Sequence, residues 1–313
     1  MVRTLSIVVW LLLIILPVGS GVLFLLVTSF DPETGVNLVA LTELLADYDS
    51  IASSLILAVA APLIACYLAL WMAPVLLKNA RLLQLLSPLL SIPHVAFAVG
   101  LMLLMSPSGW LIRLVESVSG MFPAPSAGWP LPEKSLLTVM VVLILKELPF
   151  LLLMISAQLK QLPVNSWVAQ AQSYGYSERQ AWWRIVTPEL LRRLTLPMAA
   201  VIIYSLSVVD IPLLVGSNTP GVLAQRVYEW SFQFSAGSQI KAITGAWVLL
   251  AIALVLLLIN ARHYAFYRRF VLGKKVTQPV KPNTHKASRY TWIFLGVLSL
   301  GGIVVLAIQS LAT

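Results

Sequence analysis

The chain has 313 residues, of which 59% are hydrophobic and only 11% are charged, and its formal net charge is +9. Soluble domains are about 45 to 50% apolar, so this composition excludes a soluble globular protein and indicates a protein of the lipid bilayer. The basic residues lie between apolar runs and form no groove-reading motif, which excludes nucleic acid and favours membrane lipid as a partner. Cys66 is the single cysteine, which excludes an intrachain disulfide and a cysteine metal site.

Seven apolar runs are long enough to cross a hydrocarbon core of roughly 30 Å, which takes about 20 helical residues. They are predicted to be helices, because an open strand cannot satisfy its backbone groups in lipid. The predicted fold class is therefore all-α, a polytopic membrane helix bundle with six core transmembrane helices and a seventh. The predicted spans are Leu5 to Ser29, Ile51 to Ala73, Leu83 to Met105, Ser135 to Ile155, Leu194 to Val215, Ala242 to Ile259, and Tyr290 to Ile308.

The spans divide the chain into three predicted parts. Residues 1–260 form a six-helix core with a cytoplasmic loop at 158–193, residues 261–289 form a basic cytoplasmic linker, and residues 290–313 form the seventh helix. Cytoplasmic segments of membrane proteins retain Lys and Arg, and most of the basic residues here fall in segments that are cytoplasmic when the N-terminus is inside. We therefore expect a multi-pass protein whose N-terminus lies in the cytoplasm.

Three charged residues, Lys146, Glu147 and Asp210, fall within predicted spans, where a charge at the bilayer centre costs at least about 2.5 to 3.5 kcal/mol. Lys146 and Glu147 are adjacent and point about 100° apart on a helix, so they do not pair face to face. The three residues either line a pathway or serve as structural and interfacial charges, and Asp210 lies near the outer end of its span. His94, after Pro93, is a weaker candidate, because a lone histidine beside a kink is usually just hydrogen-bonded.

The loop at 158–193 carries the most informative pattern in the chain. Pro163 suits the first turn of a helix that includes Trp167 to Ser173. Gly175 suits its end, because only glycine adopts the left-handed conformation without steric penalty. Ser177 and Gln180 then match a capping box, in which each side chain bonds to the other residue's backbone N–H. The loop is therefore predicted to form a helix, a glycine turn and a second helix.

The second helix of this loop is predicted to run to Pro188 and to present Trp182, Trp183 and Ile185 as apolar anchors. A compact helix pair on the cytoplasmic face has a shape that fits a groove on a partner protein. It also has a simpler explanation, a surface helix pair that merely closes the loop. The local physics leaves both interpretations open.

The spacing Ala169-Gln170-Ala171, three residues, Gly175, nine residues, Ile185, two residues and Pro188 resembles a known signature. It is similar to the cytoplasmic loop of binding-protein-dependent ABC importer permeases, written EAA-x3-G-x9-I-x-L-P. Ala169 stands in place of the family's Glu, Gln170 in place of the first Ala, and Thr187 in place of the Leu before Pro. The residues that determine the shape of the loop match.

The resemblance implies a type I ABC importer permease fold and a permease subunit in a bacterial inner membrane. It implies a coupling loop that docks into an ATPase subunit and a solute pathway lined by polar positions of the fourth and fifth spans. The expected partners are two ATPase subunits, which bind ATP and Mg, a second permease unit, and a periplasmic or extracellular solute-binding protein. The coupling residues are expected to be Ala169, Gln170, Ala171, Tyr174, Gly175, Tyr176, Ser177, Ile185 and Pro188, and the pathway candidates are Lys146, Glu147 and Asp210.

Motifs for catalysis are absent from the sequence. It has no G-x4-GK[ST] phosphate loop, no HExxH helix, no metal-spaced His cluster and no G-x-S-x-G elbow, so we expect no ATP hydrolysis, catalytic residue, metal or cofactor in this chain. A secondary transporter that uses Glu147 and Asp210 as ion sites is the alternative, although it leaves the glycine-centred loop unexplained. A membrane enzyme would need an acid–base pair or a metal site, and the sequence offers neither.

The C-terminal part suggests a larger transporter. Six helices with one coupling loop are followed by a basic linker and one more helix, as a second permease unit would begin. The segment Ser205 to Gly216 also resembles the fused permeases for ferric iron and thiamine. We therefore expect the chain to be, or to derive from, the first half of such a fused permease, with its solute left open.

Overall fold

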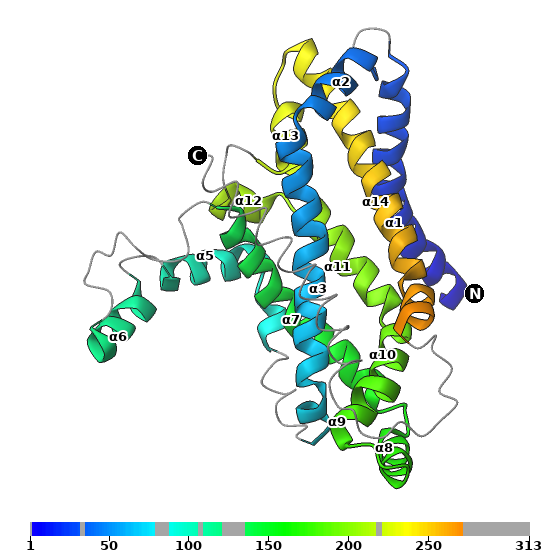
Figure 1. Ribbon diagram of the computed structural model, residues 1–313. Coiled ribbons are helices and arrows are strands. Elements are labelled where there is room, and N and C mark those ends of the chain that lie inside the picture. Colours follow the sequence, from blue (N-terminus) through cyan, green and yellow to red (C-terminus); the bar gives the residue numbers. More distant parts are fainter. Residues whose placement is uncertain are drawn as a thin grey trace.

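The computed structural model describes residues 2–31, 35–78, 88–105, 109–120, 135–216 and 221–271, and all regular elements in these ranges are helical. Long helices form one bundle, and α5 and α6 extend from it to one side (Figure 1). The elements in chain order are α1 (Val2–Ser29), α2 (Leu38–Ala46), α3 (Tyr48–Lys78), α5 (His94–Met105), α6 (Trp110–Ser119), α7 (Leu136–Leu159), α8 (Val164–Ser173), α9 (Glu178–Ala181), the π-helical turn η1 (Trp182–Val186), α10 (Thr187–Arg193), α11 (Thr195–Ser207), α12 (Asp210–Val215), α13 (Leu223–Ser231) and α14 (Ala236–Val271).

The core of the bundle lies where α3 packs along α7, with α11 against α3 and α14 against α11. The buried face of α3 carries alanines at every fourth position, namely Ala61, Ala65, Ala69 and Ala73. Small residues at this spacing let two helices approach closely, which is how helices associate in lipid without a hydrophobic driving force. Leu143 and Ile155 of α7 are fully buried in the same core cluster as these alanines.

Within the described ranges, three helices are long and apolar enough to cross a membrane, namely Tyr48–Val75, Leu136–Leu159 and Ala236–Arg262. A fourth span results if Glu178–Arg193 and Thr195–Ser207, which are bent by 63° at Leu194, are counted as one. Ile15–Ser29 and His94–Leu104 are shorter apolar helices. The predicted helix Tyr290 to Ile308 lies outside the described residues, so seven spans stay a prediction.

Two predicted spans differ from single continuous helices. The described part of Leu83 to Met105 is interrupted at Ile92 and Pro93, and α5 begins at His94. Leu194 to Val215 is divided into α11 and α12 because Val208 takes an extended conformation, with ψ at 130°. Pro93 lies at the first break, and Pro212 lies in α12 just after the second; neither supplies an N–H to the carbonyl four residues earlier. Asp210 therefore opens a short helix at a break.

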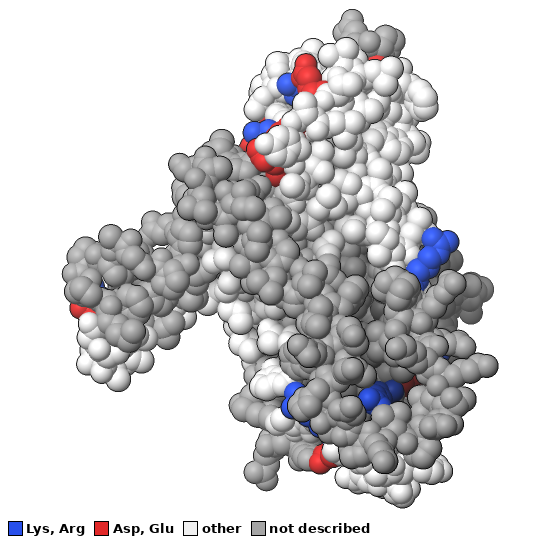
Figure 2. Space-filling view, viewed as in Figure 1, with Lys and Arg blue, Asp and Glu red and all other residues white. Residues whose placement is uncertain are grey.

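The end of the bundle that holds α2 and α13 is fixed by polar contacts. The Arg226 guanidinium of α13 pairs with the Asp47 carboxylate, and Lys241 of α14 pairs with Glu43 of α2 at 2.9 Å. The hydroxyl of Ser54 in α3 accepts a hydrogen bond from the Leu223 N–H at 2.7 Å, which caps the first turn of α13. Figure 2 shows acidic and basic side chains side by side at this end of the molecule.

The helix α14 continues to Val271, eleven residues past the predicted core boundary at 260. Residues 261–271 include no glycine or proline, so the helix has no local signal to stop where the apolar run stops. The start of the predicted linker is therefore helical. The remainder of the linker, from residue 272, lies outside the described residues.

Candidate functional site

The turn at Gly175 closes α8 with a complete Schellman motif. The Tyr176 N–H donates to the Ala171 carbonyl at 3.1 Å, and the Gly175 N–H donates to the Gln172 carbonyl at 2.9 Å. These two bonds are the pair that defines the motif, and they require a left-handed residue at the turn. Gly175 has φ of 83°, so the predicted role of this glycine is confirmed.

The capping box is confirmed in both directions. The Ser177 hydroxyl accepts from the Gln180 N–H at 3.3 Å, and the Gln180 side-chain oxygen accepts from the Ser177 N–H at 2.9 Å. Pro163 was expected in the first helical turn and instead lies one position earlier, as the cap of α8. The three-residue connection from Tyr174 to Tyr176 is thus fixed by hydrogen bonds at both ends.

The prediction that the second helix ends at Pro188 is wrong, because one helical path continues from Glu178 through η1 to Arg193. In an α-helix the ring of Pro188 would clash with the Arg184 carbonyl, and this carbonyl would also lack a donor, because proline has no N–H. In the π-helical turn, the Thr187 N–H instead donates to the Trp182 carbonyl five residues earlier. This wider turn accommodates the proline at the start of α10.

The three predicted apolar anchors do not share one role. Trp182 is only 4% exposed and belongs to the protein's own core, whereas Trp183 is half-buried and stacks on Tyr67 of α3 at 6.4 Å between ring centroids. Ile185 is exposed. Two of the anchors therefore hold the loop to the bundle, because their side chains face α3 and the core, and only Ile185 faces outward.

The signature residues of the loop divide into a buried set and an exposed set. Ala171 and Pro188 are buried and fix the loop to the bundle. Ala169, Gln170 and Tyr174 are exposed, with Tyr174 at 73%. Tyr176 is partly buried, with the Arg184 guanidinium over its ring at 5.6 Å, and Ser177 is exposed. The exposed set lies at the tip of the bundle, at the end opposite α2 and α13 (Figure 1).

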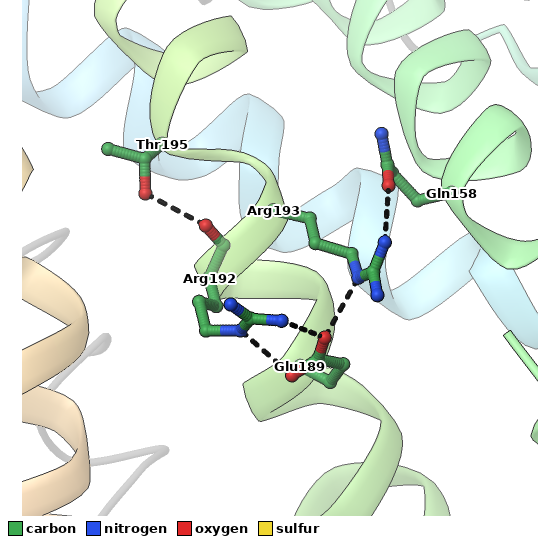
Figure 3. Close-up of polar contacts among 5 residues, drawn as sticks. All are labelled: Gln158, Glu189, Arg192, Arg193 and Thr195. Atoms are coloured by element: carbon green, nitrogen blue, oxygen red, sulfur yellow. Dashed lines mark hydrogen bonds and ion pairs between the residues drawn. The ribbon is translucent and has the colours of Figure 1, made fainter. Parts of the chain in front are cut away.

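A cluster of polar side chains ties the base of this loop to α7 (Figure 3). The Glu189 carboxylate accepts from Arg192 Nη2 at 2.6 Å and from Arg193 Nε at 2.8 Å. Arg193 also donates to the side-chain oxygen of Gln158 at 3.4 Å. The pKa of the Glu189 carboxyl lies below its usual range, mainly because its carboxylate accepts a hydrogen bond from Arg192.

This cluster was not predicted from the sequence, although Arg192 and Arg193 follow Glu189 at the helical spacing of three and four residues that brings such side chains together. The contact with Gln158 had no local signal, because it joins residues 35 apart in the sequence. Arg193 is the last residue of α10 and directly precedes the 63° bend at Leu194. The cluster therefore fixes the loop at the point where the chain turns into α11.

The intramembrane charges have separate partners. Lys146 is 3% exposed, and its ammonium donates to the carbonyls of Leu89 at 2.8 Å and Ile92 at 2.5 Å. Glu147 is 7% exposed, and its carboxylate lies 3.6 Å from His94 Nε2. The expectation that Lys146 and Glu147 do not pair face to face is thus met.

His94 brings the two broken spans together. Its ring lies 4.6 Å from the Tyr204 ring of α11, between centroids, and Asp210 of α12 is within electrostatic range of both residues. Tyr204 was not predicted from the sequence, and nothing local to it marks it out. The structure places Glu147, His94, Tyr204 and Asp210 in one polar region. In the part of the chain that the structure describes, no group of three or more His, Cys, Asp or Glu side chains could hold a metal ion.

A bundle of apolar helices with a hydrogen-bonded helix–turn–helix loop at one end defines the class as a polytopic helical membrane protein. The family described as binding-protein-dependent transport system inner membrane component matches residues 65–275, and the chain belongs to this family. The chain is also 30% identical over 270 residues to the inner membrane ABC transporter permease protein YnjC of Escherichia coli (strain K12). This match covers 83% of the chain and 49% of YnjC, so the chain spans about half the length of the curated relative it matches.

Family membership assigns the type I ABC importer permease fold and a multi-pass location in the inner membrane. It makes the chain a permease component of an ABC transporter, which has no cofactor of its own. A secondary transporter and a membrane enzyme, the two alternatives, are thereby set aside.

Proposed function

We propose that the chain forms part of the solute pathway of an ABC importer and that its loop at 158–193 docks into a separate ATPase subunit. The observation that carries this proposal is the doubly fixed turn at Gly175. Its hydrogen bonds fix the connection between α8 and the second helix. Ala169, Gln170 and Tyr174 are exposed beside this turn, while Trp182 and Pro188 are buried at the base of the loop. A rigid, exposed helix end is suited to transmit movement from a partner.

The proposed assembly contains two ATPase subunits, which bind ATP and Mg, a second permease unit and a solute-binding protein on the outer side. The cycle is alternating access, in which nucleotide and solute each bind one conformation more tightly than the other. A ligand shifts such an equilibrium only by its difference in affinity for the two states. The loop at 158–193 links the state of the ATPase to the state of the pathway.

In this proposal the N-terminus and the loop at 158–193 both face the cytoplasm. The placement of Lys and Arg along the sequence supports this orientation. The path of α1 is consistent with it, because α1 ends beside α2 at the end of the bundle opposite α8 and α9 (Figure 1). Arg226 and Lys241 then lie on the outer side, where each is paired with a carboxylate.

Purification of the chain from its host membrane tests the proposal. We expect an ATPase subunit to accompany the unmodified protein in a stable ratio, and to be retained by a variant at the opposite end of the bundle, Phe234→Ser. Phe234 is fully exposed and lies far along the chain from the loop. If no ATPase accompanies the unmodified protein, the proposal is wrong.

We also propose that Lys146, Glu147 and Asp210 belong to the solute pathway, with Glu147 and Asp210 facing it and Lys146 supporting it. The Glu147 carboxylate lies 3.6 Å from His94, and the His94 ring packs on Tyr204, where two broken spans meet. Asp210 is within electrostatic range of His94 and Tyr204, and this arrangement supports the assignment. Glu147→Gln keeps the shape of the side chain and removes its charge, so it should lower uptake several-fold with the ATPase still bound. Unchanged uptake in vesicles that contain the Glu147→Gln complex would contradict a pathway role.

A further inference from the structure

A lysine in the middle of a membrane helix is costly, and Lys146 lies in the middle of α7 with almost no exposure. Two of the three donors of its ammonium are used by the carbonyls of Leu89 and Ile92, at 2.8 and 2.5 Å. The ammonium also lies over the Phe97 ring, 5.7 Å from its centroid. These partners all belong to the broken third span, before and after Pro93.

The Leu89 carbonyl has no backbone donor four residues later, and this explains why it accepts from the Lys146 ammonium. In a continuous α-helix it would accept a hydrogen bond from the N–H of residue 93, four positions later, and that residue is Pro93, which has no N–H. A carbonyl left without a donor within a bilayer is strongly unfavourable, because no water is present to take the place of the missing donor. The Lys146 ammonium therefore replaces the missing donor, and its positive charge is favourable at the C-terminal end of a helical turn.

We infer that Lys146 is a positioning residue, an internal cap that holds the break at Pro93 so that His94 faces Glu147 and Tyr204. The structural role of Lys146 as a cap is independent of the proposed function. Its importance for uptake rests on the proposal that the chain forms part of a solute pathway. His94 follows Pro93 immediately, so any change in the break moves its imidazole. Lys146 acts through the backbone of the third span and need not touch the solute.

A double-mutant cycle with Pro93 tests this role. Lys146→Met removes the donor at nearly constant side-chain volume, and hydrogen–deuterium exchange of residues 94–104 in the purified complex should rise by about tenfold or more. Pro93→Ala restores a backbone N–H for the Leu89 carbonyl. The double variant Lys146→Met with Pro93→Ala should therefore exchange close to the unmodified rate, because the two changes compensate each other.

The exchange of residues 94–104 reports on the proposed cap, independently of whether the transporter works. Lys146→Arg should retain most of the protection, and Lys241→Met, which removes a lysine at the opposite end of the bundle, should leave residues 94–104 unaffected. If Lys146→Met does not yield folded protein, the double variant still should, since it regains the missing bond. The inference is overturned if Pro93→Ala fails to restore protection, or if Lys241→Met raises the exchange of residues 94–104 as much as Lys146→Met. Retention of the ATPase is measured separately in the same preparations.

Discussion

Replacement of Gly175 by valine should lower ATP-driven uptake by about tenfold or more. At φ of 83° an L-residue is strained by roughly 1–2 kcal/mol, and a β-branched side chain is strained further. No atom lies within 4 Å of a Cβ added at Gly175, so the effect arises from the backbone and not from a clash. The strain opens the Schellman turn and moves the exposed tip of the loop. Uptake into vesicles that contain the complete complex measures this effect.

Two matched variants test whether the backbone conformation at position 175 causes the loss of uptake. Gly175→Asn should retain most of the activity, because asparagine tolerates the left-handed conformation. Gly237→Val adds the same side chain in α14, where nothing lies within 4 Å of a Cβ and φ is ordinary, and it should leave uptake nearly unchanged. Equal losses for Gly175→Val and Gly237→Val would show that the turn has no special role.

The Trp182→Ala variant should lose about 3 to 5 kcal/mol of stability, the usual cost of removing a buried tryptophan. Trp182 and Val186 are the two buried side chains of the π-helical turn, and Trp182, the larger one, attaches the turn to the core. Its indole Nε1 is buried and has no hydrogen-bond partner among the described residues. Trp182→Phe should therefore cost much less, since it removes an unpaired donor while it keeps most of the apolar surface.

Thermal unfolding of the detergent-solubilised chain measures both Trp182 variants. Trp71→Ala is the matched control, because Trp71 is mostly exposed on α3 and its removal leaves no cavity. The expected order of unfolding temperatures is Trp71→Ala highest, Trp182→Phe next and Trp182→Ala lowest. A Trp182→Ala variant as stable as Trp71→Ala would contradict the anchoring role.

Local features of the loop were predictable because they depend on a few consecutive residues. Gly175, Ser177 and Gln180 determine a turn and a cap through bonds that span no more than five positions. The path through Pro188 was not predictable in the same way. Whether a proline ends a helix or is accommodated by a π-helical turn depends on packing, here on the burial of Trp182 and Val186.

The membrane part shows the same distinction between local and tertiary information. Apolar length predicted where helices lie, but proline did not predict where they break. Four prolines lie inside continuous helices, namely Pro17, Pro62, Pro74 and Pro149. Pro93 instead lies at a break, where Lys146 donates to the carbonyls of Ile92 and Leu89, which are 54 and 57 residues away from it in the sequence. The approach of His94 to Tyr204 likewise depends on how α5 packs against α7 and α12.

Site-directed cross-linking in intact cells tests most directly whether the exposed tip of the loop contacts an ATPase. A photoreactive residue at position 174 replaces the exposed Tyr174. A second, at position 234, replaces the exposed Phe234 in the connection between α13 and α14. The proposal predicts a cross-link to the ATPase subunit from position 174 and none from position 234. A cross-link to the ATPase from position 234, with none from position 174, would place the coupling surface at the other end and contradict both the orientation and the role of the loop.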